Sequence, residues 1–253
     1  MGEHVAPTTP AKKKRSNIFW NIVGVVGELL ITFAIIVGLF SVWQLYWTTY
    51  EVAGQVSQTI ASYEEEHQPA KRTLGEVRTD DPPAFDREVG DGEVYGLVHV
   101  PTWDWMKIPL AEGTTSYVLD QGWAGHYDMT TQPGGVGNFS VAGHRRTYGN
   151  NFRWIDRLTQ GDKVVVEVDD HYLVYSMVSS EIIDATDPTQ MRVVAPVIDD
   201  VSWSETPTER WMTMTTCHPE YGNWQRYIVH LKFESWTPKD TGVPAELVDE
   251  PTN

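Results

Sequence analysis

The sequence predicts an all-β domain that follows one N-terminal membrane-spanning helix, and three observations lead to this prediction. Between residues 93 and 235, about seven or eight short strand patterns rich in Val and Tyr are separated by turn residues, with little helical periodicity among them. Short strands around one core are typical of a β-barrel or a β-sandwich. An apolar run over residues 18–47 precedes them and exceeds the ~20 residues that cross a bilayer.

The N-terminal segment has the pattern of an uncleaved signal-anchor. A basic cluster from Lys12 to Arg15 comes before the apolar run, so we expect residues 1–17 to be a cytoplasmic tail and the chain after residue 47 to lie outside the cell. No small-residue cleavage site follows the run closely. Glu28 is the one charge inside it, and we expect it either in a helix–helix contact or near the cytoplasmic interface.

Charge excludes one large class of partner. The chain has a formal net charge of −16, and residues 48–253 carry 15 Lys and Arg against 33 Asp and Glu. Nucleic-acid binding needs a basic surface, so it is not expected. One cysteine and scattered histidines give no metal-ligand spacing, and we expect no metal and no cofactor.

The segments that flank the domain are polar. Residues 48–92 are rich in Glu, Asp, Gln, Thr and Pro, and we expect an extracellular linker or stalk, with residues 52–67 as a candidate continuation of the helix. The folded domain covers residues 93–235. Residues 236–253 are rich in Pro, Asp and Glu, and we expect a flexible C-terminal tail.

Within the domain, each element is bounded by turn residues. Hydroxyl side chains before a brief apolar turn favour a short helix over residues 114–119, and residues 152–158 can form one or two helical turns that end at Gly161. Residues 121–127 and 132–135 have the composition of loops. We expect strands over residues 94–100, 106–110, 137–144, 163–168, 172–178, 181–183, 211–216 and 227–233.

Cys217, the one cysteine of the chain, stands where a strand pattern ends and a turn begins. An unpaired cysteine in an exported protein is a candidate reactive thiol, and the alternative is a small buried apolar residue. Arg226 opens the next strand pattern, and antiparallel pairing of the two strands would bring it close to Cys217. His144 ends the strand pattern over residues 137–144. A thiol attacks as the thiolate, so a neighbouring His and Arg are the residue types that its chemistry requires.

These residues resemble the pattern of the sortase family, the membrane-anchored cysteine transpeptidases of Gram-positive bacteria. Thr213 to Cys217 match the family motif Thr-Leu-x-Thr-Cys, with Met214 in place of Leu, and Arg226 follows on the next strand. Leu and Met are similar in volume and apolarity, so we expect this exchange to be mild. Gly143 to Arg145, together with residues 216–219, look most like class E, the housekeeping type of high-GC species. The resemblance covers roughly residues 93–233 and implies an eight-stranded closed β-barrel.

The resemblance also implies an activity. Cys217 would attack the Thr–Gly carbonyl of a sorting signal, with His144 as general acid and then base, and Arg226 would hold the substrate or stabilise the oxyanion. The signal expected for class E is Leu-Ala-x-Thr-Gly rather than Leu-Pro-x-Thr-Gly. The partners implied are surface proteins that carry such a C-terminal signal, a peptidoglycan precursor or another amine as acceptor, and the membrane.

Substrate-binding residues are expected on both sides of the thiol. Thr216 precedes it, and Tyr148 is a candidate selector of the signal. Residues 189–209 form a connection longer than most loops. The resemblance places one wall of the substrate groove here, so the candidate groove residues are Val193, Val194, Ala195, Pro196 and Val197. A buried edge strand over these residues is the alternative.

Several alternatives remain open from the sequence. The same cysteine and histidine would serve a protease or hydrolase that uses water as acceptor, and an anchored β-barrel that only binds a partner is a non-enzymatic alternative. His126 and His218 are further candidate histidines near the site. Asp120 and Asp128 are candidates to orient a histidine, although solvated loop acids are the simpler interpretation.

Overall fold

The computed structural model describes residues 18–67 and 72–251, so the basic cluster of the expected cytoplasmic tail lies outside the described residues. The helices are α1 (Ile18–His67) and α2 (Ser116–Leu119), and the 3-10 helices are η1 (Pro101–Trp103), η2 (Ile155–Arg157), η3 (Pro188–Val194) and η4 (Ala245–Leu247). The strands are β1 (Val94–Val100), β2 (Met106–Glu112), β3 (Ala124–His126), β4 (Gly137–Ala142), β5 (Lys163–Val168), β6 (His171–Asp184), β7 (Arg210–His218) and β8 (Gln225–Pro238).

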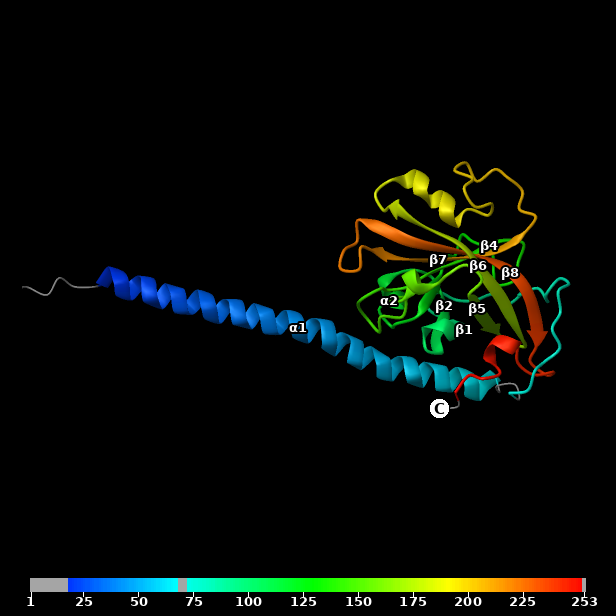
Figure 1. The fold of residues 1–253 in the computed structure, drawn as a ribbon, viewed down its shortest axis with the longest axis horizontal. Helices are drawn as coiled ribbons and strands as arrows, with labels where there is room; N and C mark the ends of the chain where they lie inside the picture. Colours follow the sequence, from blue (N-terminus) through cyan, green and yellow to red (C-terminus); the bar gives the residue numbers. More distant parts are fainter. Residues whose placement is uncertain (1–17, 68–71, 252–253) are drawn as a thin grey trace, which may run out of the picture. The chain divides into compact units, whose positions relative to one another are not determined.

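The eight strands close into one mixed barrel (Figure 1), which confirms the expected fold class. Neighbours around the barrel are β1-β2-β3-β4-β7-β8-β6-β5. The pairs β2–β3 and β4–β7 are parallel, and the other pairs are antiparallel. Because β4 and β7 are parallel neighbours, the residues that follow them leave the barrel at the same end.

Strand β3 was missed from the sequence, where residues 121–127 are expected to be loop. Its three residues are too short for an alternating pattern, and Gly125 and the preceding Gly122 favour a turn interpretation. The strand exists because it pairs with β2 on one side and with β4 on the other. Long-range pairing therefore overrides the local signal.

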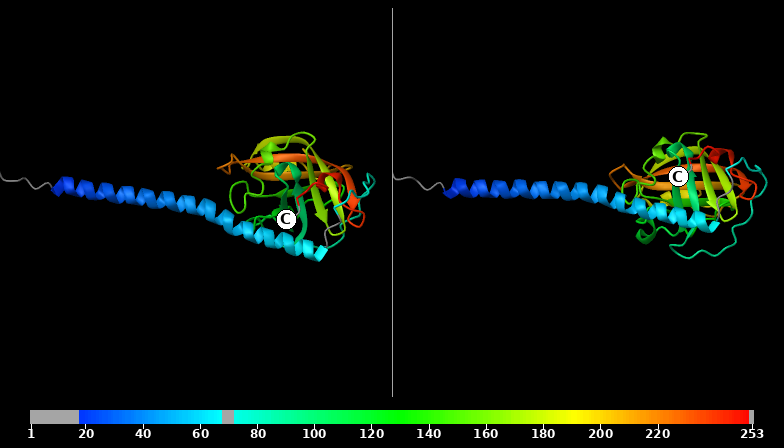
Figure 2. Two further views of the ribbon diagram at one scale, coloured as in Figure 1. Left: turned by 60° about the horizontal axis from the view of Figure 1, so that its bottom comes forward. Right: turned by 90° about the horizontal axis from the view of Figure 1, so that it is seen from below.

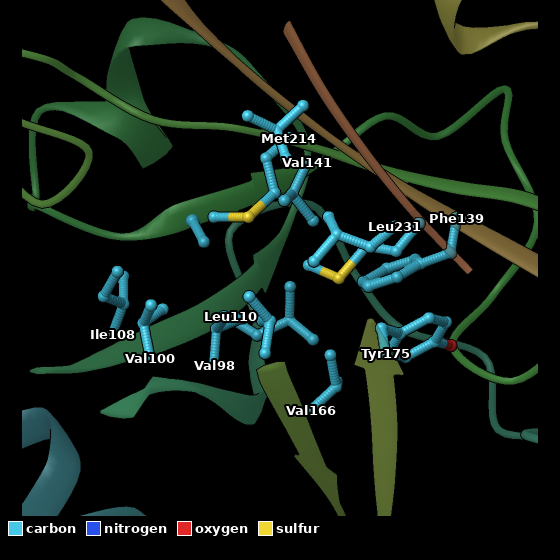
Figure 3. Close-up of a cluster of buried hydrophobic side chains, with 14 of the residues drawn as sticks. Val98, Val100, Ile108, Leu110, Phe139, Val141, Val166, Tyr175, Met214 and Leu231 are labelled. Atoms are coloured by element: carbon cyan, nitrogen blue, oxygen red, sulfur yellow. The ribbon is translucent and has the colours of Figure 1, made fainter. Parts of the chain in front are cut away.

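The barrel interior is a single apolar core (Figure 3). Val98, Leu110, Phe139, Met214 and Leu231 come from five different strands, and none of these side chains is more than marginally exposed. Alternate residues of each strand point inward, as the pleat requires. The core closes the barrel and leaves the strand ends to carry the site.

Residues 236–253, expected to be a flexible tail, instead pack on the barrel as far as they are described. Strand β8 continues to Pro238, and η4 follows. Val243 and Leu247 are buried against Val165 and Tyr172, on the outer face of β5 and β6. A few apolar residues spaced along this polar segment are enough to cover the outer face. The overall composition of the segment, which is polar, does not reveal them.

Helix α1 is longer than the expected membrane segment. Residues Phe19–Trp43 are long and apolar enough to cross a membrane. The chain divides within the helix, after Gln44, into two compact units. In the second unit the helix continues to His67, where the sequence suggested a linker with only a candidate helix. Val52 and Tyr63 are buried in this part, and residues 56, 60 and 64 are half-buried, which is the spacing of one helix face.

The rest of the expected linker follows the barrel surface. Leu74 bridges to Val243, and Arg78 bridges to Trp236 through backbone hydrogen bonds. The Arg78 guanidinium also lies 5.0 Å from the Trp236 ring centroid. The chain between residues 72 and 93 is therefore attached to β8 and to the C-terminal segment.

A buried group of charges fastens the C-terminal segment. His99 contacts Glu250 at 3.1 Å through Nδ1 and Glu167 at 2.9 Å through Nε2. Lys239 lies 2.8 Å from Glu167, and Lys107 lies 3.3 Å from Glu250. Buried charges need such partners. Strands β1, β2 and β5, the residue that follows β8 and the C-terminal segment thus meet in one cluster, which we call the buried charge cluster.

Candidate active site

Cys217 and Arg226 face each other across a strand pair. The thiol is at the end of β7, Arg226 is at the start of β8, and the two residues are register partners. Cys217 is a free, half-buried thiol. The antiparallel hairpin therefore pairs the two residues, as the sequence predicts from strand pairing, and the Arg226 guanidinium donates to the carbonyls of Asn223 at 2.7 Å and Gln225 at 2.9 Å.

His144 is held against the same strand end. It lies two residues after β4, and Gly143 N–H donates to the carbonyl of Thr215 at 3.1 Å. In return, the Thr216 hydroxyl donates to the carbonyl of Gly143 at 2.6 Å. These two bonds tie the residue before His144 to the two residues before Cys217. The Thr216 side chain is itself buried, so its hydroxyl joins the two strand ends and is not exposed at the surface.

Asp120 contacts His144, which differs from the simpler interpretation of a solvated loop acid. Its Oδ1 lies 2.7 Å from Nε2 of the imidazole, and both side chains are partly exposed. An ionised carboxylate only accepts hydrogen bonds, so this contact assigns the proton to Nε2 and leaves Nδ1 as the nitrogen that can exchange a proton. Asp120 caps the short helix α2, and 24 residues separate it from His144.

Tyr148 lies on the histidine. The two ring centroids are 5.2 Å apart, with an interplanar angle of 31°. Tyr148 has a positive φ of 48°, in a turn that continues into Gly149 with φ 91°. The turn therefore points Tyr148, the candidate selector, back toward His144.

A groove of about 230 Å³ opens beside Arg226. Tyr127, Thr215, Val193 and Val194 also line it. The Tyr127 hydroxyl lies 2.9 Å from the Thr215 hydroxyl. Burial raises the pKa of Tyr127, while Thr215 and the Arg226 charge act in the opposite direction, so the phenol is protonated at neutral pH. The groove offers an apolar wall, a phenol and a guanidinium to a peptide.

The long connection forms the wall as a 3-10 helix. Val193 and Val194 of η3 are in the groove lining, although each is almost fully buried. Ala195 is fully buried, and Pro196 and Val197 line a separate hollow of about 150 Å³. A helical wall exposes only some successive residues to one side, so the five residues expected to line one groove do not share one surface. The structure also differs from the alternative, an edge strand over residues 193–197, because these residues form no strand.

Asn138 fixes this wall to the barrel and was not singled out from the sequence. Its Nδ2 donates to the carbonyls of Val193 at 3.0 Å and Ala195 at 3.1 Å. Thr213 donates to Asn138 Oδ1 at 2.8 Å, so the amide is held at both ends. A buried amide in a strand next to the cysteine strand is the only local signal that could have indicated it.

His218 is used structurally by Arg145. The buried Arg145 donates from Nη1 to His218 Nδ1 at 2.8 Å and from Nη2 to Asp156 at 2.7 Å. Burial and the Arg145 charge lower the pKa of His218. A neutral ring that accepts from an arginine braces the turn after Cys217 and does not serve as the proton partner.

His126 is a core histidine. It is fully buried, with Nδ1 2.8 Å from Glu112 and Nε2 3.1 Å from the Thr131 carbonyl. Of the histidines considered from the sequence, His144 and His218 lie at the thiol's end of the barrel, and the ring of His218 is engaged by Arg145. Within residues 18–67 and 72–251, no group of three His, Cys, Asp or Glu side chains is arranged to hold a metal ion.

Comparison with known proteins gives one consistent family. A family model described as the sortase domain matches residues 98–234. Sortase SrtE1 of Streptomyces coelicolor is 36% identical over 229 residues, which is 88% of this chain and 60% of that protein. The chain thus spans less than two thirds of that relative's length. Sortase SrtE2 of the same organism is 31% identical over 223 residues, covering 86% of this chain and 84% of that protein.

Solved structures agree with this. The SrtA sortase from Actinomyces oris has a TM-score of 0.64 and 43% identity, and the match covers 70% of this chain and 100% of that one. Sortase E1 from Streptomyces coelicolor, solved with a tripeptide in the active site, has a TM-score of 0.55 and 38% identity, with 63% and 99% coverage.

Proposed function

The chain belongs to the sortase family of cysteine transpeptidases and is similar to class E, and we propose that it cleaves a Leu-Ala-x-Thr-Gly-like sorting signal and joins the released protein to a cell-wall amine. Cys217, His144 and Arg226 are the proposed catalytic residues. The single observation that carries the proposal is the register pairing of Cys217 with Arg226, next to a His144 segment that is bonded to the same strand.

In the first half-reaction, the Cys217 thiolate attacks the carbonyl carbon of the signal's Thr. A C–S bond forms, the Thr–Gly C–N bond breaks, and the departing amine takes a proton from Nδ1 of His144. Nδ1 has this role because Asp120 occupies Nε2. The Arg226 guanidinium stabilises the oxyanion that forms on the attacked carbonyl.

In the second half-reaction, an acceptor amine attacks the thioester. His144 Nδ1 takes the proton from the attacking amine, the C–S bond breaks, and a new amide forms as the thiolate leaves. The same nitrogen, Nδ1 of His144, therefore donates a proton in the first half-reaction and accepts one in the second. No other reactant is needed, because one amide is exchanged for another.

The groove beside Arg226 is the proposed site of the signal. Its apolar wall at Val193 and Val194 suits the Leu side chain, and the Tyr127 hydroxyl can donate to a peptide carbonyl. Tyr148, against His144, is the proposed selector of Ala over Pro. Surface proteins with a C-terminal signal and a peptidoglycan precursor are the proposed partners.

The proposed location follows from the apolar helix. Sortases are membrane-anchored, and Phe19–Trp43 can span a membrane. We place residues 1–17 in the cytoplasm because of the basic cluster, and the barrel outside the cell. Protease treatment of intact cells should then remove the barrel and leave an N-terminal tag protected, and an accessible N-terminal tag would contradict this orientation.

Product analysis tests the reaction class. The full chain in detergent is incubated with a Leu-Ala-x-Thr-Gly peptide, with and without a peptide amine as acceptor. Transpeptidation predicts a ligated product that depends on the amine and is absent with Cys217→Ala. Exclusive hydrolysis at every amine concentration would instead identify a protease-type enzyme.

A further inference from the structure

The second half of α1, beyond Gln44, lies along the barrel in both views of Figure 2. Its contacts are concentrated at two places. Val52 is 6% exposed and Tyr63 is 4% exposed, while between them residues 56, 59 and 60 are half-buried and the others are exposed. Between the two places the helix borders a hollow of about 660 Å³. The contact at Val52 is therefore a local one.

At Val52 the helix meets two glycines. A Cβ added to Gly122 would lie 2.7 Å from a Val52 methyl and 2.9 Å from a Val56 methyl. A Cβ added to Gly149 would lie 3.3 Å from the same Val52 methyl. Both glycines have positive φ, 76° and 91°, so each stands in a turn that other residues adopt with strain. The helix thus packs directly onto two turn backbones.

These two turns carry the side chains that contact His144. Gly122 follows Asp120 by two residues, and Gly149 follows Tyr148 directly. The turns are also joined to each other, because Asn151 Nδ2 donates to the carbonyl of Trp123 at 2.9 Å. Asp120 lies 2.7 Å from the imidazole, and the Tyr148 ring lies 5.2 Å from it. One chain of contacts therefore runs from the helix to the histidine.

We propose that Val52 and Val56 of α1 are positioning residues for His144, acting through the turns that carry Asp120 and Tyr148. This inference rests on the proposed catalytic role of His144. The helix that continues from the apolar segment is then a working part of the enzyme. It limits the movement of the two turns, so that Asp120 stays on Nε2 and the imidazole keeps its orientation.

The other contact keeps the helix attached when Val52 is changed. Glu64 accepts from Lys107 at 2.7 Å, and the Tyr63 hydroxyl donates to the Tyr95 carbonyl at 3.5 Å. Lys239 also lies 5.5 Å from the Tyr63 ring centroid. A charge at position 52 should therefore loosen the helix only where it meets the turns.

The test compares Val52→Asp with Gln55→Asp in the full chain in detergent. Both variants add the same carboxylate to the same turn of α1, but Gln55 is exposed. Val52→Asp should lower kcat for the Leu-Ala-x-Thr-Gly peptide about tenfold, because small displacements of a proton-transfer group are costly. The groove beside Arg226 is built from other elements, and Tyr148 is the one proposed binding residue on the displaced turns, so KM should rise less than kcat falls. Gln55→Asp should match the wild type.

A double-mutant cycle separates positioning from general destabilisation. If Val52 acts through Asp120 on His144, Val52→Asp should lose most of its effect in an Asp120→Ala background. Val52→Ala, which removes two methyl groups and adds no charge, should give a smaller drop in kcat and a small drop in melting temperature. Equal kcat for Val52→Asp and Gln55→Asp, or full additivity with Asp120→Ala, would overturn the inference. An inactive wild type would instead contradict the proposed function itself.

Discussion

At the scale of single residues, the Asp120 contact decides which nitrogen of His144 is available for chemistry. A carboxylate 2.7 Å from Nε2 fixes the ring orientation, and in the proposed reaction it remains the partner of Nε2 while Nδ1 exchanges the proton. The family motif contains the histidine, the cysteine and the arginine, and it does not contain this acid. The residue was visible in the sequence only as one of two loop aspartates.

Replacing Asp120 tests this assignment. Asp120→Ala removes the acceptor and should lower kcat for signal cleavage about tenfold or more, within the range of general acid–base effects. Asp120→Asn keeps an acceptor oxygen without the charge, so it should fall between Ala and wild type. Asp128→Ala, at the other loop aspartate, is the matched control. Wild-type kcat in Asp120→Ala would show that the contact has no part in proton transfer.

At the scale of elements, the strand patterns and their pairing were predictable, and the connections between them were less so. Alternation and turn residues indicated β1, β2, β4 to β8 and the short helix α2, because each of these has a local signal. Strand β3, the helical wall η3 and the second half of α1 depend on what they pack against. Residues 52, 56, 60, 63 and 67 do have helical spacing, but the polar residues between them dominated the composition.

The residues of the site divide in the same way, into those with a local sequence signal and those that depend on long-range contacts. Cys217, Arg226 and His144 stand at strand ends, where sequence order and pairing place them. Asp120, Asn138 and Arg145 act through contacts between segments that are distant in the sequence. The separation from Asn138 to the carbonyls that it holds is 55 and 57 residues. Such contacts require the fold to be known.

Asn138 provides a prediction at this scale. Asn138→Ala leaves the carbonyls of Val193 and Ala195 without their donor, so it should lower the free energy of unfolding by about 1–3 kcal/mol. The loosened wall should raise KM for the signal peptide more than it lowers kcat. Val201→Ala, at an exposed position of the same connection, should change neither. Unchanged KM and melting temperature in Asn138→Ala would contradict the role of this amide.

At the scale of the whole molecule, the buried charge cluster joins the barrel to the C-terminal segment and makes stability depend on pH. Burial alone would lower the pKa of His99, but its bonds to Glu167 and Glu250 raise it overall. Burial would raise the pKa of Glu167, and the hydrogen bond and charge of His99, with Lys239, outweigh this and lower it to about 2. The pKa of Glu250 is lowered by His99 and Lys107 against its burial.

The directions of these pKa shifts define the pH range in which the cluster contributes most to folding stability. The lowered carboxyl pKa values stabilise the fold above the ordinary Glu pKa of ~4.3, and this contribution is lost as pH falls toward 2. The raised pKa of His99 contributes fully below the ordinary His pKa of ~6.5 and is lost as pH rises through its folded value. The cluster should therefore stabilise most between about pH 4.5 and 6.5.

Glu250→Gln tests this window and the attachment of the C-terminus together. Melting temperatures measured from pH 3 to 9 should show the largest difference between wild type and Glu250→Gln inside the window, and a smaller one at either end. Glu246→Gln, in the neighbouring η4, is the control. A difference that is constant with pH would mean that charge has no part in holding the segment.

The proposed reaction requires that Cys217 form a thioacyl bond with a sorting signal. Intact mass of the full chain in detergent, incubated with a Leu-Ala-x-Thr-Gly peptide, measures this directly. We predict a mass gain equal to the peptide acyl portion that ends at Thr, absent with Cys217→Ala and strongly reduced with His144→Ala. A wild-type protein with a titratable thiol that gains no mass from this peptide, or from its Leu-Pro-x-Thr-Gly counterpart, would contradict it.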